Sequence, residues 1–479
     1  MSVPIRKWSS GVSDRQLATL VGIGLLAVYV TIQRGLVIGY DGDIMLQVAE
    51  SIVHNGNLET TRDPFRFNTP YSTYGFGVTL FAVPLVAGSV WTSGTRDQWA
   101  TLLNPALLAA GAAVIVAIGR DLGWSRRLSV CAALAFGLLT MTPWMSTEMF
   151  AEPGTTLGLA LAVWGIVRYF ARPPAGLALI GWGLALSVLF RTDSLVLVVV
   201  PVLIVFVAHE GWSVLKERSV LVGVGVPLMV IGAWIAFYNA YRYGSIFDGG
   251  YHGYGFTTPI LEGMKVILLQ PGKGFFWYNP LLLCAIPGIV FLGRRAAAIA
   301  WLVGVLTVVR FLFYAAWTSP TGGVGWGPRF LFPLCFVLII PAAEFWRWIG
   351  GRRGAAKFAG ATVVAVLAAG AAGLSALSVW VPYEQWWRIV STREAGESRA
   401  LVAGRIARYY SDLRLGHIAG DLRVLDHATP FPLEHWDNGP QPIGVIALLV
   451  AVACITAALL AARRTDRAAA RVTVSGVAA

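Results

Sequence analysis

Residues 219–241 read SVLVGVGVPLMVIGAWIAFYNAY, a stretch without a charged side chain that decides the fold class. A helix needs about 20 predominantly apolar residues to cross a bilayer, and the charge-free stretches 358–383 and 439–462 meet this requirement too. Across all 479 residues, 56% are hydrophobic and 13% are charged, whereas a soluble domain is about one quarter charged. The composition therefore excludes an ordinary soluble enzyme and predicts an all-α polytopic membrane protein.

Twelve apolar stretches are predicted as transmembrane helices. They cover residues 17–39, 100–119, 127–145, 153–171, 174–190, 194–208, 218–239, 276–293, 296–317, 329–346, 358–381 and 441–462. One more apolar stretch, Tyr71–Trp91, is ambiguous, because counting it as a span reverses the sidedness of everything after it. We predict a broken segment at the outer surface of the membrane, since Gly75, Gly77 and Pro84 disfavour a regular helix.

The basic residues decide between the two topologies, because cytoplasmic loops are enriched in Lys and Arg. With residues 71–91 outside, most basic residues between the spans are cytosolic. Those left outside are Arg96, Arg191, Arg242, Lys265, Lys273 and Arg329. We therefore predict cytosolic N- and C-termini and an extracytoplasmic active site; for a bacterial protein the membrane is then the plasma (inner) membrane.

The net charge of +12 does not indicate a nucleic-acid partner, because the basic residues lie in short clusters between apolar stretches, as membrane topology requires. The four cysteines lie inside apolar stretches and have no metal-ligand spacing. The carboxylates are scattered, so no clustered ligand set supports a divalent metal, which stays an open alternative, and no other cofactor is predicted.

These predictions divide the chain into four regions. They are a cytosolic N-terminus (1–16), a catalytic transmembrane region (17–346), C-terminal helices (347–462) and a cytosolic tail (463–479). The outer segments are 39–99, 239–279, which is rich in Gly and Tyr, and 382–440, which lacks an apolar core for a domain of its own.

The first outer segment opens with GYDGDIMLQVAESIVHNGNL, residues 39–58. Apolar residues recur there at helical spacing, which predicts an amphipathic helix over Asp43–His54 lying on the membrane. Asp41 and Asp43 lie at its N-terminal end, where backbone N–H groups and the helix dipole favour carboxylates. A helix cap uses one aspartate, so the second indicates a role beyond capping.

An acidic residue at the exit of the first span, followed by an interfacial helix with an HNGNL-like turn, resembles the GT-C glycosyltransferases. These enzymes take a sugar from a polyprenyl-phosphate carrier, and they include the protein O-mannosyltransferases and the bacterial aminoarabinose transferase. The resemblance covers residues 17–346 and implies a GT-C-like bundle of about 12 transmembrane helices with interfacial helices in the first outer loop. It implies that Asp41 is the catalytic base. Gly42 stands where the family has Glu, so Asp43 is the alternative.

A second acidic motif is TPWMSTEMFAEPGTT, residues 142–156, between the third and fourth spans. Glu148 and Glu152 are four residues apart and share a face if the segment is helical. Alternatively, they form a solvated rim where Pro153 begins the next helix. The resemblance implies only that both lie near the active site. Tyr74 and His252, in the first two outer segments, are further substrate-proximal candidates.

Three outer motifs supply candidate cations for the donor phosphate. They are LFRTDSL (189–195) with Arg191, LLQPGKGFFWYNP (268–280) with Lys273, and SPTGGVGWGPRFLFP (319–333) with Arg329. Glycines beside Lys273 let backbone N–H groups and an ammonium approach an anion closely. WGPRFLFP resembles a recurrent segment of the family. The alternative interpretations are a local salt bridge from Arg191 to Asp193 and a headgroup anchor at Arg329.

The predicted activity is transfer of a sugar from a polyprenyl-phosphate carrier to a cell-envelope glycan, lipid or protein on the outer face, with inversion. That chemistry needs a carboxylate base and cations for the departing phosphate, so Asp41 and the three cations must share an outer pocket. The alternatives are a transporter or flippase and a glycan ligase with a diphosphate-linked donor. The bias towards Ala, Gly, Val and Arg suggests a GC-rich bacterial genome, such as an actinobacterial one, and a role in its cell wall.

Overall fold

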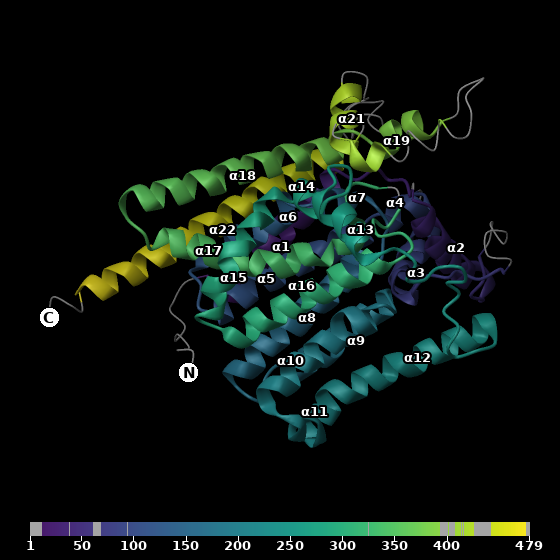
Figure 1. Ribbon diagram of the computed structural model, residues 1–479, viewed down its shortest axis with the longest axis horizontal. Coiled ribbons are helices and arrows are strands. Elements are labelled where there is room, and N and C mark those ends of the chain that lie inside the picture. Colours follow the sequence, from purple (N-terminus) through teal and green to yellow (C-terminus); the bar gives the residue numbers. More distant parts are fainter. Residues whose placement is uncertain are drawn as a thin grey trace. The chain divides into compact units, whose positions relative to one another are not determined.

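Figure 1 shows the computed structural model of the chain. It describes residues 12–37, 39–60, 69–92, 94–323, 325–392, 401, 408–412, 414, 416–425 and 442–475. Every regular element within these ranges is helical, which confirms the all-α prediction for them. The chain forms two compact units, each described by itself. The first comprises Met1–Gly137, Glu148–Gly250 and Gln441–Ala479, and the second comprises Leu138–Thr147 and Tyr251–Pro440.

The first unit contains most of the N-terminal helices and the last helix. Its elements are α1 (Asp14–Thr31), α2 (Tyr40–Asn55), α3 (Phe76–Val90), α4 (Arg96–Ala100), α5 (Leu103–Asp121), α6 (Arg126–Leu138), α8 (Glu152–Ala171), α9 (Leu177–Phe190), a π-helical turn (Leu195–Val199) leading into α10 (Val200–Glu210), a 3₁₀ turn (Trp212–Lys216), α11 (Arg218–Val220), a π-helical turn (Leu221–Gly225) leading into α12 (Val226–Tyr243), and α22 (Pro442–Ser475). α1 packs along α5 and α22, and α8 packs along α5 and α9.

Glycines set the close approach of α8 to α9. A Cβ at Gly158 would lie 2.6 Å from the carbonyl oxygen of Gly183, and one at Gly165 would lie 2.6 Å from the amide nitrogen of Ile180. Small residues let helix backbones approach this closely in membranes, where close packing takes the place of the hydrophobic effect between helices. This pair fixes the start of α8 beside the end of α9, where Glu152 and Arg191 lie.

The first outer segment folds into α2 and α3, which pack against each other. α2 confirms the predicted amphipathic helix and extends it to Tyr40. Its buried face carries Met45, Leu46 and Ala49, which form one apolar cluster with Val78 of α3. The helix therefore presents Asp41 and Asp43 at an end that is anchored by packing.

The prediction of a broken segment over Tyr71–Trp91 is wrong, because α3 is a continuous helix with Pro84 inside it. The two glycines serve packing instead: a Cβ at Gly77 would lie 2.6 Å from the ring of Phe190, at the end of α9. With 15 residues, α3 is about 22 Å long, shorter than the hydrocarbon core of about 30 Å. Its place at the outer surface stays a prediction.

The second unit is built from the following elements. They are α7 (Thr142–Thr147), α13 (Ile260–Met264) with a π-helical turn (Lys265–Leu269), α14 (Phe275–Tyr278), a 3₁₀ turn (Pro280–Cys284) leading into α15 (Ala285–Gly293), α16 (Ala297–Ala316), a 3₁₀ turn (Arg329–Leu331), α17 (Pro333–Gly350), α18 (Gly354–Trp380), α19 (Tyr383–Ser391) and α21 (His417–Val424). α17 packs along α15, and α7 packs on α18. Most of the predicted outer segment 382–440 lies outside the described residues.

Helices within the described residues occupy all twelve predicted ranges. Seven are long and apolar enough to cross a membrane: Arg96–Asp121, Glu152–Ala171, Arg218–Tyr243, Ala297–Ala316, Pro333–Gly350, Gly354–Trp380 and Gly444–Arg463. The range 127–145 is corrected, because α6 ends at Leu138 after 13 residues and α7 is a separate turn. A helix of that length spans only about 20 Å. The total number of spans and the cytosolic termini remain predictions.

Candidate active site

The two candidate bases lie in the first turn of α2, and their partners distinguish them. The Tyr74 hydroxyl donates a hydrogen bond of 2.6 Å to Oδ1 of Asp41. Asp43 accepts hydrogen bonds from the Arg96 guanidinium at 2.8 Å and from the Gln47 side chain at 2.7 Å. The dipole of α2 stabilises the negative charge of both carboxylates. Asp43 is held by an ion pair, whereas Asp41 is oriented by a hydroxyl group.

Arg96, the first residue of α4, makes Asp43 part of the contact between α2 and α4. Its guanidinium pairs with Asp43, with Glu50 at 2.9 Å and with Asp97 at 3.1 Å. Asp43 and Glu50 are seven residues apart, so they share one face of α2. This single cation therefore ties α2 to α4. The sequence identifies Arg96 only as an outer basic residue and gives no sign of this contact.

Gly42, between the two aspartates, lies against the segment before α8. A Cβ at this position would lie 2.7 Å from the backbone oxygen of Met149 and 2.9 Å from its Cβ. Because a backbone atom stands there, a glutamate at this position does not fit without a shift of α2 or of the Met149 segment. The absence of a side chain is what lets the first turn of α2 approach that segment.

Tyr74 is positioned by Arg242, which lies at the end of α12 and is 6% exposed. The Arg242 guanidinium donates to the backbone oxygens of Ser72 and Tyr74 and, at 2.8 Å, to Oδ1 of Asn239. The Tyr243 hydroxyl also donates to Ser72, at 3.1 Å. The end of α12 thus fixes the backbone before α3. The sequence places Arg242 only among the outer basic residues. The signal that could have indicated its role is an arginine among tyrosines at the end of a predicted helix.

Glu148 lies beside the N-terminus of α2 and pairs with Arg34, which sequence reasoning missed. The two side chains are 1% and 2% exposed, and Nη1 of Arg34 lies 3.7 Å from the nearer carboxylate oxygen. The side chain of Asn104, on α5, donates to the backbone oxygens of Glu148 and Phe150 and so clamps the segment before α8. A Cβ at Gly39 would lie 3.7 Å from the other carboxylate oxygen of Glu148.

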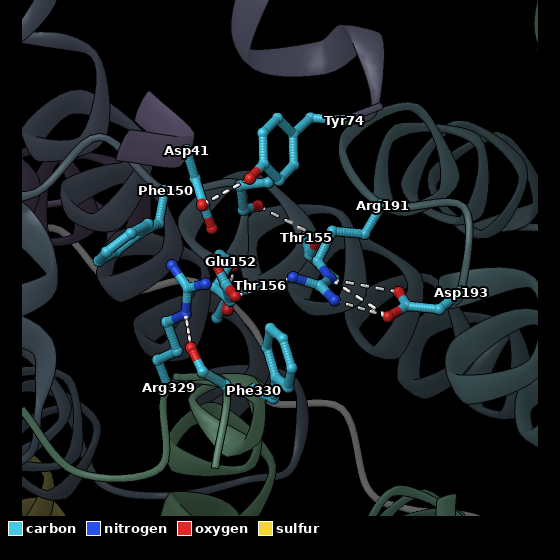
Figure 2. A network of polar contacts seen from close by, with 12 residues as sticks. Asp41, Tyr74, Phe150, Glu152, Thr155, Thr156, Arg191, Asp193, Arg329 and Phe330 are labelled. Carbon is cyan, nitrogen blue, oxygen red and sulfur yellow. Dashed lines mark hydrogen bonds and ion pairs between the residues drawn. The ribbon is translucent and has the colours of Figure 1, made fainter. Parts of the chain in front are cut away.

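Glu152 begins α8 and faces a different cation. Nη1 of Arg191 donates to Glu152 at 2.8 Å, and Nη2 of Arg191 donates to Asp193 at 2.7 Å. The predicted local salt bridge from Arg191 to Asp193 is therefore confirmed, with Glu152 as a second carboxylate. The predicted shared helical face of Glu148 and Glu152 is wrong, because Glu148 precedes the helix and each carboxylate has its own arginine. Figure 2 shows Asp41, Glu152 and Arg191 around a common space.

The other two predicted cations lie in the second unit. Lys273 is fully buried, and its ammonium donates hydrogen bonds to the backbone oxygens of Gly323 at 3.1 Å, Gly325 at 2.6 Å and Gly327 at 3.1 Å. Burial, helped by the neighbouring Arg329 guanidinium, lowers the pKa of Lys273 to about 7. The sequence predicts a cation open to an anion, whereas this ammonium faces the backbone of a glycine-rich loop.

Arg329 follows that loop and begins the 3₁₀ turn before α17. Its Nε donates to the backbone oxygen of Gly322 at 2.6 Å, and its guanidinium lies 5.3 Å from the ring centre of Phe330. The side chain of Arg310, from α16, reaches the same turn and donates to the backbone oxygen of Phe330 at 3.0 Å. The second unit thus gathers three basic side chains at one loop.

His252, the remaining candidate, is exposed in the segment between α12 and α13 and belongs to the second unit, whereas Asp41 belongs to the first. Within the described part of the chain, no three His, Cys, Asp or Glu side chains cluster in a way that would hold a metal ion. The candidate carboxylates are instead distributed among arginines and a tyrosine.

The apolar helices define a multi-pass membrane protein, and the likeness of the chain to solved structures shows the GT-C fold. The solved structures that establish this fold are those of ArnT from Cupriavidus metallidurans. The form bound to undecaprenyl phosphate matches with a TM-score of 0.53 and 13% identity, over 95% of this chain and 78% of that chain. The apo form matches with a TM-score of 0.55 and 14% identity, over 92% of this chain and 76% of that chain.

The archaeal oligosaccharyltransferase AglB from Archaeoglobus fulgidus, in complex with an inhibitory peptide and a dolichol-phosphate, gives a TM-score of 0.49 and 12% identity. That match covers 89% of this chain and 61% of that chain. No protein-family model and no curated protein matches the chain. At these identities the likeness to ArnT establishes the fold, and the activity depends on the chemistry of the site.

Proposed function

We propose that this protein transfers a sugar from a polyprenyl-phosphate carrier to a hydroxyl group of a cell-envelope acceptor, on the extracytoplasmic face of a bacterial plasma membrane. The observation that carries the proposal is the hydrogen bond from Tyr74 to Asp41, because it orients a half-buried carboxylate at the start of α2. Arg191 and Glu152 line the same space. The ArnT structure with bound undecaprenyl phosphate supports a lipid phosphate as the ligand class.

In the proposed reaction, Asp41 takes the proton of the acceptor hydroxyl as its oxygen attacks the anomeric carbon. The bond from that carbon to the phosphate oxygen breaks, and polyprenyl phosphate leaves with the electron pair. Attack opposite the leaving group inverts the anomeric centre. A positioned general base contributes about 10²–10⁴-fold to such a step. Tyr74 keeps Asp41 in the orientation that accepts the proton.

The departing phosphate gains negative charge, so cations stabilise the transition state. We assign this role to Arg191, in the same unit as Asp41, and the sequence predicts the same role for Arg329 of the second unit. Arg191 is already neutralised by Glu152 and Asp193, so a phosphate displaces one of these carboxylates from the guanidinium or binds beside them. The sequence also predicts Lys273 as a phosphate ligand, but its buried position among backbone oxygens favours a different role.

A transfer assay with the purified protein and a panel of polyprenyl monophosphate sugars tests the proposal. Label should pass from at least one donor to an envelope acceptor, and Asp41→Asn should abolish this transfer while the protein still expresses and folds. Transfer only from a diphosphate-linked oligosaccharide would instead identify a glycan ligase. Counter-transport of labelled substrate by liposomes without any carrier lipid would identify a transporter.

A further inference from the structure

The loop before Arg329 is shaped by glycines in the left-handed region. Gly322, Gly323, Gly325 and Gly327 have φ of 79°, 81°, 149° and 67°. Side chains other than glycine rarely adopt such angles. These glycines let carbonyl groups of a short segment accept hydrogen bonds from two cations.

The two cations divide these carbonyls between them. Three oxygens meet the ammonium of Lys273, and the fourth, from Gly322, meets Nε of Arg329. An ammonium has three N–H donors, so the count of donors matches the three carbonyls. Buried carbonyl groups need such partners, because leaving one unpaired costs about 1–3 kcal/mol. The fold of the loop therefore depends on a side chain about 50 residues earlier in the chain.

We propose that Lys273 is a positioning residue: its ammonium holds the glycine-rich loop in the conformation that presents Arg329, and it does not itself contact the substrate. The inference rests on the proposed function in one respect, namely that Arg329 binds the phosphate of the carrier lipid. The loop geometry is independent of that assignment.

The ionisable groups around this loop determine how its conformation depends on pH. Arg329 and Arg310 contact the loop and the turn after it, and the ionisable groups packed near the Lys273 segment are Tyr278, Tyr409, Tyr410 and Asp421. Asp421 is fully buried in α21 and interacts with Tyr278 and Tyr409. The tyrosines are neutral near pH 7, and the positive Arg329 guanidinium disfavours the charged form of Lys273.

A phosphate bound at Arg329 offsets the positive charge that disfavours protonation of Lys273. Binding and protonation are therefore coupled, and the coupling is reciprocal. Because burial lowers the pKa of Lys273 to about 7, much of the free protein lacks this proton at pH 8. Phosphate binding at pH 8 should take up to about one proton from the buffer, whereas at pH 6 it should take up almost none.

Local opening of the loop, with the Lys273 segment still packed, removes the carbonyl partners of an ammonium that stays buried. The pKa of Lys273 is then lower in the opened state than in the closed one, because hydrogen bonds to the charged form are lost. Loss of the proton therefore favours the opened loop, and the closed loop is most stable below about pH 7.

Hydrogen exchange of the intact protein in detergent tests the loop without any substrate. In the wild type, protection of the 319–331 segment, corrected for intrinsic exchange, should fall as the pH rises from 6 to 8.5. In Lys273→Met, protection should be low at every pH. Lys265→Met, an exposed lysine of the same unit, is the matched control and should behave as the wild type. Wild-type protection that stays constant or rises over this pH range would overturn the proposal even if the variant fails to fold.

Calorimetric binding of undecaprenyl phosphate separates an indirect role from a direct contact. Lys273→Met and Arg329→Met should each weaken binding by about tenfold or more, and the double variant should bind no more weakly than Arg329→Met. Additive losses would show that Lys273 contacts the phosphate itself and would refute the positioning role. If the wild type does not bind undecaprenyl phosphate, the proposed function fails, and the exchange experiment still decides the role of Lys273.

Discussion

Replacing Asp41 by Asn removes the carboxylate that we propose as the base and leaves its shape intact. The amide oxygen of Asn can still accept the hydrogen bond from Tyr74, which is 2.6 Å long in the wild type, so the packing of α2 is preserved. The loss is then that of general-base catalysis, about 10²–10⁴-fold in the rate of transfer.

Asp43→Asn is the matched control, two residues further along the same turn. The side chains of Asp43 and Arg96 are 36% and 16% exposed, and ion pairs that solvent reaches contribute about 0–1 kcal/mol. Arg96 also keeps Glu50 and Asp97 as partners in this variant. The control should therefore lose at most about fivefold in rate, the equivalent of about 1 kcal/mol.

Single-turnover transfer from a labelled polyprenyl monophosphate sugar measures both variants, and thermal unfolding in detergent checks that both are folded. We expect a gap of at least about twentyfold between them, the ratio of the smaller base effect to the control loss. A larger loss in Asp43→Asn, or near-normal turnover in Asp41→Asn, would refute the assignment of the base.

Tyr74→Phe removes the hydrogen bond to Asp41, and because bonds to charged groups contribute about 1.5–3 kcal/mol, turnover should fall about 10–100-fold, while the unfolding temperature falls by only several degrees and the protein stays folded. Arg34→Met leaves the buried Glu148 carboxylate without its ion pair, which should lower the free energy of unfolding by about 3–5 kcal/mol. Adding Glu148→Gln should restore most of the lost unfolding temperature. An unchanged unfolding temperature in the single variant would contradict this. The pKa of Lys273 is lowered from 10.5 to about 7, so between these values the globally unfolded chain holds a proton that the folded chain lacks. Stability measured by thermal unfolding should be flat below about pH 7 and rise above it, and this rise should be absent in Lys273→Met.

The sequence predicts the helices well because their signals are local. Predominantly apolar stretches lie on helices in every predicted range, and apolar residues at helical spacing are enough to locate α2. One helix that the sequence misjudges, α3, carries Gly77 and Pro84. Both residues disfavour helices in isolation, and here the contact with Phe190 outweighs that preference.

For the candidate site too, the local sequence identifies the candidate residues and the tertiary structure distinguishes between them. The spacing around Gly42 indicated Asp41 and Asp43 as candidates, and nothing local distinguishes two aspartates in one helical turn. Tyr74 and Arg96 distinguish them, and these partners come from residues more than 30 and 50 positions away.

By itself, the sequence determined that this protein is a helical membrane protein and that Asp41 and Asp43 begin a helix after the first span, because hydropathy and helical periodicity depend on neighbouring residues. Only the tertiary structure decided which carboxylate meets a hydroxyl, which meets an arginine, and that Lys273 faces three carbonyl groups. Those outcomes depend on hydrogen bonds and ion pairs between residues far apart in the chain, which form only when packing brings their helices together.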